Sequence, residues 1–384
     1  MKKRVLLDLI ILLSAFFFSC HIGENTPDVV SSATRNKRAV LEPLLKQFMP
    51  QAMEDGMVKV AVIRNLATGE YARQYMESCI AEGRAMGFIV DSFNLSGDDE
   101  YCRRHILQIA AADYDGFILS LRGAGPVYNS LLPEIDKRIK IVTFDGLPQE
   151  NDIRKDALFG VSCTSQDDAG LAEISLNALI DRFAAPVRLI SIVARPGIPP
   201  MDRRNVVYER YIREGRVIET ARISPQNFVY ARSGIREALI NVLAEFPPGT
   251  VDAIWAPYDE FAKGCFDVLD ETGRREIKLV SIDISNNIFK LMLDHADQWI
   301  ASATTDPSIA GVVNMRLLAA KLAGESPPAA HVFRAQLVET SMINHSVSMA
   351  NIALHIPGWP SHEGLIEYPW MALLKDGAAG RGGR

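Results

Sequence analysis

The chain has 384 residues, 48% of them hydrophobic, so it can bury a full core and is long enough for two lobes rather than one. Its net charge of -6 at pH 7 excludes a basic surface that would attract nucleic acid or an anionic membrane. The five cysteines form no C-x-x-C pair and no metal-ligand spacing, so we expect no bound metal or cofactor. We interpret the last four, Cys79, Cys102, Cys163 and Cys265, as small buried hydrophobes.

The N-terminus has the pattern of an export signal. A basic start at residues 2–4 precedes the apolar stretch Leu9–Phe18, which has signal-peptide length and is too short to span a membrane. The sequence FFSC that ends at Cys20 resembles a loose lipobox of bacterial lipoproteins, in which Cys20 would be the lipidated first residue; ordinary secretion with an incidental Cys20 is the alternative. We therefore expect a signal peptide over 1–20, a polar tether over 21–56, and a protein of the periplasm or cell envelope.

The first lobe is predicted from a β-α-β unit. Val58–Ile63 is a short β-branched run typical of a buried parallel strand, residues 72–86 carry an apolar stripe at helical spacing, and Phe88–Phe93 is the next strand. Ligands on parallel sheets bind at the carboxyl ends of the strands, so Arg64–Tyr71 is the first candidate binding segment. Further strands are expected at Gly116–Leu121, Ile139–Phe144 and Leu158–Ser162, with helices at Asp98–Ala112 and Val127–Ile135.

The same alternation of helix and strand then restarts, which predicts a second α/β lobe of similar size. Its strands are expected at Val187–Val193, Val217–Ile223, Val251–Trp255, Lys278–Ile282 and Trp299–Ala303. Its helices are expected at Asp168–Phe183, Val206–Arg213, Gly234–Glu245, Tyr258–Leu269, Ile288–His295 and Ser308–Leu322. The tail from Ser346 is interrupted by prolines, and its end, Ala378–Arg384, is expected to be disordered.

The order of these segments resembles the type I periplasmic sugar-binding proteins, the ribose- and galactose-binding group of ABC-transporter receptors. The resemblance covers roughly Met57 to Glu339. It departs from the family at Gly146, where Arg often follows the first Asp, and at Tyr258, which replaces an Asn. It is carried by five segments in the family's order and spacing, namely VKVAVI, IKIVTFD, AIWAPYDEFAKG, KLVSIDIS and ASATTDPSIAG.

The resemblance implies an α/β fold of two Rossmann-like lobes with parallel sheets, joined by a hinge of three crossovers near Thr164, Thr305 and His331. Residues 57–164 with 306–331 would form the N-terminal lobe. Residues 165–305 with 332–345 would form the C-terminal lobe, and 346–384 would be an extension.

The resemblance also implies a ligand site at the matching positions. Carboxylates would accept hydrogen bonds from ligand hydroxyls, an amide would donate and accept, and aromatic rings would cover the C–H faces of a sugar. The implied ligand-binding residues are Asn65, Tyr71, Asp145, Arg203, Phe228, Tyr258, Asp283 and Thr305.

Each of these residues has a structural alternative. The two aspartates could be strand-end caps, Tyr71 and Phe228 could belong to the core, and Arg203 could be a solvated surface charge. Asp259 and Glu260 are interpreted as the start of a helix, where carboxylates favour the dipole, and are therefore left out of the site.

The implied function is that of a solute-binding receptor for an ABC importer, which clamps a small polyhydroxylated ligand such as a sugar by hinge closure. Its partner would be a permease in the cytoplasmic membrane, and it would touch the membrane itself only through a lipid anchor. A module that reports ligand occupancy to a membrane sensor, and a binder of a nucleoside, are the alternatives. A DNA-binding regulator is excluded because an export signal stands where its basic helix-turn-helix would be. An enzyme is not expected, because G-x-S-x-G, a P-loop and paired histidines are absent from the sequence.

Overall fold

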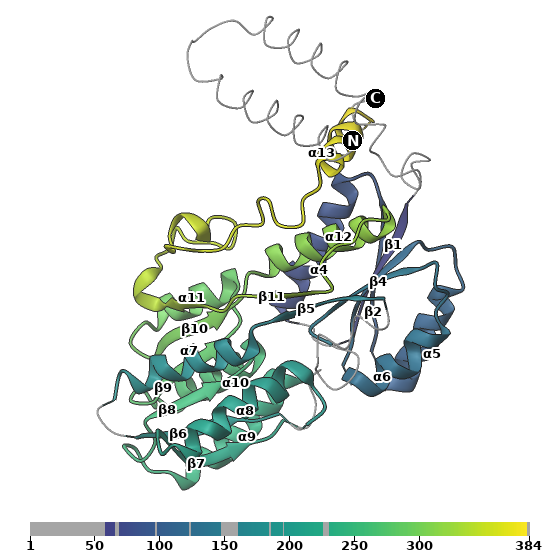
Figure 1. Cartoon of the computed structure of the whole chain (residues 1–384). Helices are drawn as coiled ribbons and strands as arrows, with labels where there is room; N and C mark the ends of the chain where they lie inside the picture. Colours follow the sequence, from purple (N-terminus) through teal and green to yellow (C-terminus); the bar gives the residue numbers. More distant parts are fainter. Residues whose placement is uncertain are drawn as a thin grey trace, which may run out of the picture. The chain divides into compact units, whose positions relative to one another are not determined.

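Two six-stranded sheets organise the chain (Figure 1). The strand order is β11-β5-β4-β3-β1-β2 in the first sheet and β12-β10-β9-β8-β6-β7 in the second. Paired strands are parallel except β10 and β12, which confirms the predicted α/β fold with two Rossmann-like lobes. This computed structural model describes residues 58–65, 69–96, 98–122, 124–146, 160–183, 186–194, 196–225 and 230–381.

The first sheet is buried on both faces at its centre. Its middle strands β1 (Lys59–Arg64), β3 (Gly116–Ser120) and β4 (Lys140–Phe144) carry almost only inaccessible side chains, which is why they are continuous apolar runs rather than alternating ones. The other strands of this sheet are β2 (Ile89–Asn94), β5 (Ser162–Gln166) and β11 (Ala330–Phe333). The helices of this lobe are α4 (Glu70–Ala85), α5 (Asp99–Ala110), α6 (Ala124–Leu131), the short 3-10 turn Leu132–Glu134 and α12 (Pro307–Leu322).

The second sheet divides its lobe into two apolar layers. Along β6 (Val187–Ile192), Ile190 and Ile192 belong to one core cluster, whereas Val187 and Leu189 belong to the other, as the alternation of a strand requires. Its other strands are β7 (Val217–Ile223), β8 (Ala253–Ala256), β9 (Lys278–Ile282), β10 (Trp299–Thr304) and β12 (Gln336–Glu339). Its helices are α7 (Asp168–Ile180), α8 (Pro199–Arg213), α9 (Ala231–Glu245), α10 (Asp259–Glu271), α11 (Asn286–Asp294) and the 3-10 turn Thr340–Met342.

Two predicted elements need correction, and two strands were not predicted. The fifth strand was expected at Leu158–Ser162, but β5 runs from Ser162 to Gln166, because polar Ser and Thr side chains concealed a fully buried strand. The helix expected from Val206 begins at Pro199, where two prolines occupy the first turn and have no N–H that needs a partner. The four-residue strands β11 and β12 were not predicted, because each is too short to show a period of its own.

The chain crosses between the lobes three times: between β5 and α7, between β10 and α12, and between β11 and β12. Thr164 and His331, expected to mark two of these crossings, lie inside β5 and β11, which continue to Gln166 and Phe333. Helix α12 packs on α4, β3 and β4 of the first lobe, although it follows the second lobe in sequence.

The C-terminal segment contacts both lobes. Its first part adds four buried side chains to a core cluster of the second lobe, and Trp359 Nε1 donates to Asp306 Oδ2 at 2.9 Å. Its last helix, α13 (Pro369–Arg381), packs against α4 (Figure 1), so the expected disorder from Ala378 to Arg381 is wrong. The four core residues are Val347, Ile352, Ile356 and Trp359, and the second of these begins a 3-10 turn, Ile352–Leu354.

Cys79, Cys102, Cys163 and Cys265 are buried, as predicted, and no disulfide joins them to another described residue. None of the helices in the described part of the chain is long and apolar enough to cross a lipid bilayer. Cys20 and the rest of the predicted signal peptide and tether lie outside the described residues.

Candidate functional site

A cavity lies where the carboxyl ends of strands from both sheets meet. Its walls come from the N-terminal turns of α4, α8 and α10. It measures about 40 Å³ in this conformation, whereas ligand pockets usually measure roughly 300–1,000 Å³, so lobes or side chains must move to admit a ligand. A larger hollow of about 390 Å³ lies beside α7 and β12, away from these strand ends. The polar residues that line the smaller cavity are Arg64, Asp145, Gln166, Arg204 and Asp283, with Tyr71 and Tyr258 beside them.

Asp145 and Asp283 occupy equivalent positions in the two lobes. Asp145 directly follows β4 and Asp283 directly follows β9, and their backbone N–H groups donate to the next strand at 2.9 and 2.8 Å. Both residues have positive φ angles, 61° and 78°, in the left-handed region that aspartate enters more easily than most side chains. The two strand-end carboxylates that the sequence predicted therefore face one cavity.

Burial raises the pKa of both carboxyls. The pKa of Asp145 rises to about 6, because desolvation and the charge of Asp168 outweigh the opposing effect of Arg203. The pKa of Asp283 rises to about 7, mainly through desolvation, against which the nearby Arg204 acts. The Oδ1 atom of Asp283 has no hydrogen-bond partner. A ligand that donates a hydrogen bond to this oxygen would replace the hydrogen bond to water that burial has removed.

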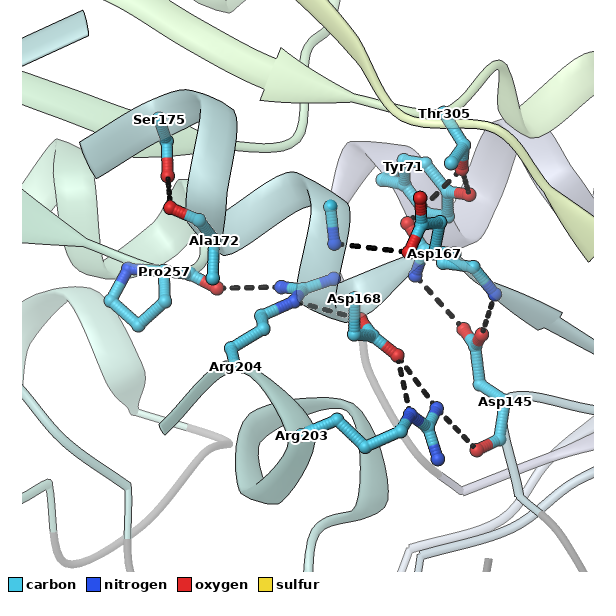
Figure 2. Close-up of polar contacts among 12 residues, drawn as sticks. Tyr71, Asp145, Asp167, Asp168, Ala172, Ser175, Arg203, Arg204, Pro257 and Thr305 are labelled. Atoms are coloured by element: carbon cyan, nitrogen blue, oxygen red, sulfur yellow. Dashed lines mark hydrogen bonds and ion pairs between the residues drawn. The ribbon is translucent and has the colours of Figure 1, made fainter. Parts of the chain in front are cut away.

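A chain of hydrogen bonds links the first lobe to the hinge (Figure 2). Tyr71 Oη and Thr305 Oγ1 lie 2.7 Å apart, and the same hydroxyl of Thr305 donates to Gln166 Oε1 at 3.1 Å. Gln166 in turn donates from its backbone N and its Nε2 to the two carboxylate oxygens of Asp145, both at 3.1 Å. Residues from α4, from two hinge crossings and from the end of β4 therefore hold one another in place.

Two arginines of α8 share one carboxylate, Asp168 at the start of α7 (Figure 2). Arg204 Nε donates to Asp168 Oδ1 and Arg203 Nε to Oδ2, both at 2.8 Å. Arg204 also donates to Pro257 O at 2.6 Å, and Arg203 to Asp145 O at 3.2 Å. Arg204 is fully buried and lines the cavity, whereas Arg203 is half-buried and does not line it.

A second group of charges joins the lobes at the start of α10. The ammonium of Lys263 lies 2.6 Å from Glu260, 3.5 Å from Asp259 and 3.9 Å from Glu70, which begins α4 of the other lobe. Asp259 is fully buried, its carboxylate oxygens have no hydrogen-bond partner, and desolvation raises its pKa to about 6. Neither Asp259 nor Glu260 lines the cavity.

The structure distributes the predicted site residues unequally. The cavity is lined by Tyr71, Asp145, Tyr258 and Asp283. Thr305 does not line it but forms a hydrogen bond with Tyr71, which does. Asn65 does not line it: its side chain accepts from Arg122 N at 2.6 Å and donates to Cys102 Sγ at 3.1 Å. Arg203 does not line the cavity and instead donates to Asp168, and Phe228 lies outside the described residues.

Three polar lining residues, Arg64, Gln166 and Arg204, are not in the predicted set. Arg64 ends β1 and lies in the candidate binding segment Arg64–Tyr71, in which Asn65 is the predicted site residue. Gln166 escaped because β5 was placed four residues too early. Arg204 stands next to the chosen Arg203, and only the helix phase of α8 decides which of the two faces inward.

The glycine after the first aspartate also has a structural reason. A Cβ atom at Gly146 would lie 2.8 Å from Leu121 O and 2.8 Å from the Tyr128 ring and hydroxyl. No larger side chain fits there without moving backbone, so the positive charges of this site come from Arg64 and α8 instead.

Solved structures of transporter binding proteins resemble this chain. No family model and no curated protein matches the chain. A solved structure of a sugar ABC transporter protein from Yersinia enterocolitica is 32% identical, with a TM-score of 0.77 over 86% of this chain and 98% of that one. The solute-binding protein of a 5-methylthioribose transporter from Thermotoga lettingae, in complex with that sugar, is 22% identical, with a TM-score of 0.76 over 86% of this chain and 99% of that one. A solute-binding protein from Agrobacterium vitis with bound allitol is 16% identical, with a TM-score of 0.65 over 78% and 99%. The last two likenesses show the fold alone.

Proposed function

Because this chain belongs to the type I periplasmic sugar-binding proteins, the solute-binding components of sugar ABC transporters, we propose that its interlobe cavity binds a small, uncharged polyhydroxylated ligand. The observation that carries the proposal is the pair Asp145 and Asp283, one from each lobe, which face one cavity together with Arg64 and Arg204. Carboxylates accept and guanidinium groups donate, so together they suit the hydroxyl edge of a sugar or polyol.

The fold gives this binding a mechanism. Asp145 and Arg64 belong to the first lobe, whereas Asp283 and Arg204 belong to the second, so a ligand completes its hydrogen bonds only when both lobes contact it. Ligand binding would therefore favour the closed arrangement of the hinge, since a ligand shifts an equilibrium toward the state in which it makes more contacts. Tyr71 and Tyr258 offer ring faces for the C–H surface of the ligand.

The wider cellular role follows from the family. The closed, ligand-loaded protein would deliver its sugar to a permease in the cytoplasmic membrane. Cys20 would carry the lipid that keeps the protein at the membrane surface after export. The structural relatives that hold 5-methylthioribose and allitol support a pentose derivative or an open-chain polyol as the first ligands to test.

Thermal unfolding of the purified protein with pentoses, hexoses, polyols and nucleosides tests the proposal. A ligand at a hundred times its Kd stabilises the folded state by about 2.7 kcal/mol. We expect a shift with one sugar or polyol class that Asp283→Asn abolishes, because the variant puts an NH2 donor in place of one of the two acceptor oxygens. Asp297→Asn, an exposed aspartate just before β10, should keep the shift. A shift with nucleosides alone would overturn the sugar assignment, and no shift with any compound would count against the proposal as a whole.

A further inference from the structure

Arg64 is the one buried arginine of the described chain that is not saturated by the protein itself. Three arginines are less than 5% exposed: Arg64 at 2%, Arg204 at 1% and Arg316 at 3%. Arg204 donates to Asp168 and Pro257 O, and Arg316 donates to Glu82 and to two backbone carbonyls. In Arg64, by contrast, Nε and Nη1 are buried without any hydrogen-bond partner.

The surroundings of Arg64 fix its position without satisfying its donors. The guanidinium carbon lies 4.9 Å from the ring centroid of Tyr75 and 6.0 Å from that of Phe144, and these two rings stack on each other at 4.3 Å. Tyr75 is itself held, because its hydroxyl accepts from Asn314 Nδ2 at 2.7 Å. Cation–π contacts offset only part of the hydration that a buried guanidinium loses, so the position is costly unless another acceptor arrives.

The nearest carboxylate does not supply that acceptor. Asp145 acts on Arg64 only through space, and its oxygens already accept from the backbone N and Nε2 of Gln166. Arg64 lines the cavity beside both residues, so the movement of lobes or side chains that admits a ligand would bring its unpaired donors within reach of that ligand. An unpaired buried donor at a binding surface costs stability in the free protein and gains its partner on binding.

The charges around the cavity indicate what kind of acceptor fits. The charged groups that line it are two guanidinium groups and two carboxyl groups, so the ligand need not bring a charge of its own. A guanidinium can only donate hydrogen bonds, whereas an ionised carboxylate can only accept them. The guanidinium groups are those of Arg64 and Arg204, and the carboxyl groups are those of Asp145 and Asp283.

We propose that Arg64 is a specificity-determining residue, which donates to acceptor oxygens of an uncharged sugar or polyol from the first-lobe side, opposite the acceptor that Asp283 presents from the second lobe. This inference rests on the proposed function and narrows it. The ligand therefore needs an acceptor oxygen where it faces Arg64 and a donor hydroxyl where it faces Asp283. Removing the oxygen that meets Arg64 leaves the buried donors unpaired again, which is the condition under which binding sites reject analogues most strongly.

The test is Arg64→Met, measured in two ways. Met keeps much of the length of the side chain but has no donors and no charge, so we expect the ligand-free protein to unfold at an equal or higher urea concentration than wild type. Affinity for the sugar found in the thermal screen should fall roughly 10- to 100-fold by calorimetry, the range expected from losing a hydrogen bond to a charged group. Arg64→Lys, which keeps the charge but not the planar fork, should fall between the two.

Controls separate a ligand contact from a structural role. Arg316→Met removes an equally buried but saturated arginine outside the cavity, so it should lower stability. If Arg64→Met lowers stability to the same extent, Arg64 is a structural residue and the inference is overturned. Unchanged affinity in Arg64→Met overturns it as well.

The ligand arm compares a neutral sugar, its deoxy analogues and its aldonate. One deoxy analogue should bind the wild-type protein much more weakly than the parent sugar does. The Arg64→Met variant should bind this analogue and the parent sugar with equal affinity, since the missing oxygen and the missing guanidinium remove the same contact. Tighter binding of the aldonate than of the neutral sugar would overturn the assignment of an uncharged ligand. A wild-type protein that binds no compound of the series would count against the proposed function, and the stability arm alone would then decide whether Arg64 is structural.

Discussion

The C-terminal segment should depend on one buried arginine, Arg316 of α12. Its Nε donates to Glu82 at 2.6 Å, and its Nη1 donates to the carbonyls of His362 and Leu365 at 2.9 and 3.0 Å. Lys375 of α13 contacts the same Glu82 carboxylate at 2.7 Å. These contacts join the tail to α4 and α12 of the first lobe.

We expect Arg316→Met to lower the free energy of unfolding by about 3–5 kcal/mol, because it breaks a buried ion pair and leaves Glu82 with a single partner. Lys375→Met should cost only about 1 kcal/mol, since the lysine side chain is 26% exposed and its pairing is screened by water. The ranking of the two variants therefore tests burial rather than the number of ion pairs.

The assay is urea unfolding followed by circular dichroism, with limited proteolysis of the native proteins beside it. Arg316→Met should make the chain between the 3-10 turn Ile352–Leu354 and α13 the first site of cleavage, because two of the tail's backbone carbonyls lose their donor. A loss below about 1 kcal/mol for Arg316→Met, or equal losses for both variants, would refute the reasoning, since a buried pair must cost more than an exposed one.

Two further predictions concern close packing and pH. Gly311→Ala should lower the free energy of unfolding by about 1–3 kcal/mol, because its Cβ would lie 2.5 Å from Tyr75 O in the contact between α12 and α4. Gly234→Ala in α9, whose Cβ would meet nothing within 4 Å, should be neutral or stabilising. Equal effects of the two variants in urea unfolding would contradict the close contact. Asp283→Asn should stabilise the ligand-free protein most at pH 8 and little at pH 4. A carboxyl whose pKa rises to about 7 on folding contributes stability below its unfolded pKa of about 3.9, and that contribution is lost as the pH rises through 7. A difference between variant and wild type that stays constant from pH 4 to pH 8 would exclude the raised pKa.

The candidate site was only partly predictable, and the residues show why. Asp145 and Asp283, which the family resemblance implies as ligand-binding residues, each directly follow an apolar strand, and both line the cavity. Gln166 was missed because β5 has no apolar run, and its register is set by pairing with β4 and β11. Asn65 was chosen although its side chain turns to Arg122 and Cys102, contacts that local sequence does not reveal.

The sequence by itself determined the alternation of strands and helices, the restart that gives two lobes, and the strand ends at which polar residues of the candidate site lie. These features depend on local hydrophobic periodicity, which acts over the length of one element. Tertiary structure alone decided which polar groups meet, as when Tyr71 and Thr305, 234 residues apart, come within 2.7 Å. It also decided that Nε and Nη1 of Arg64 have no hydrogen-bond partner, because that depends on the groups that surround the side chain in space.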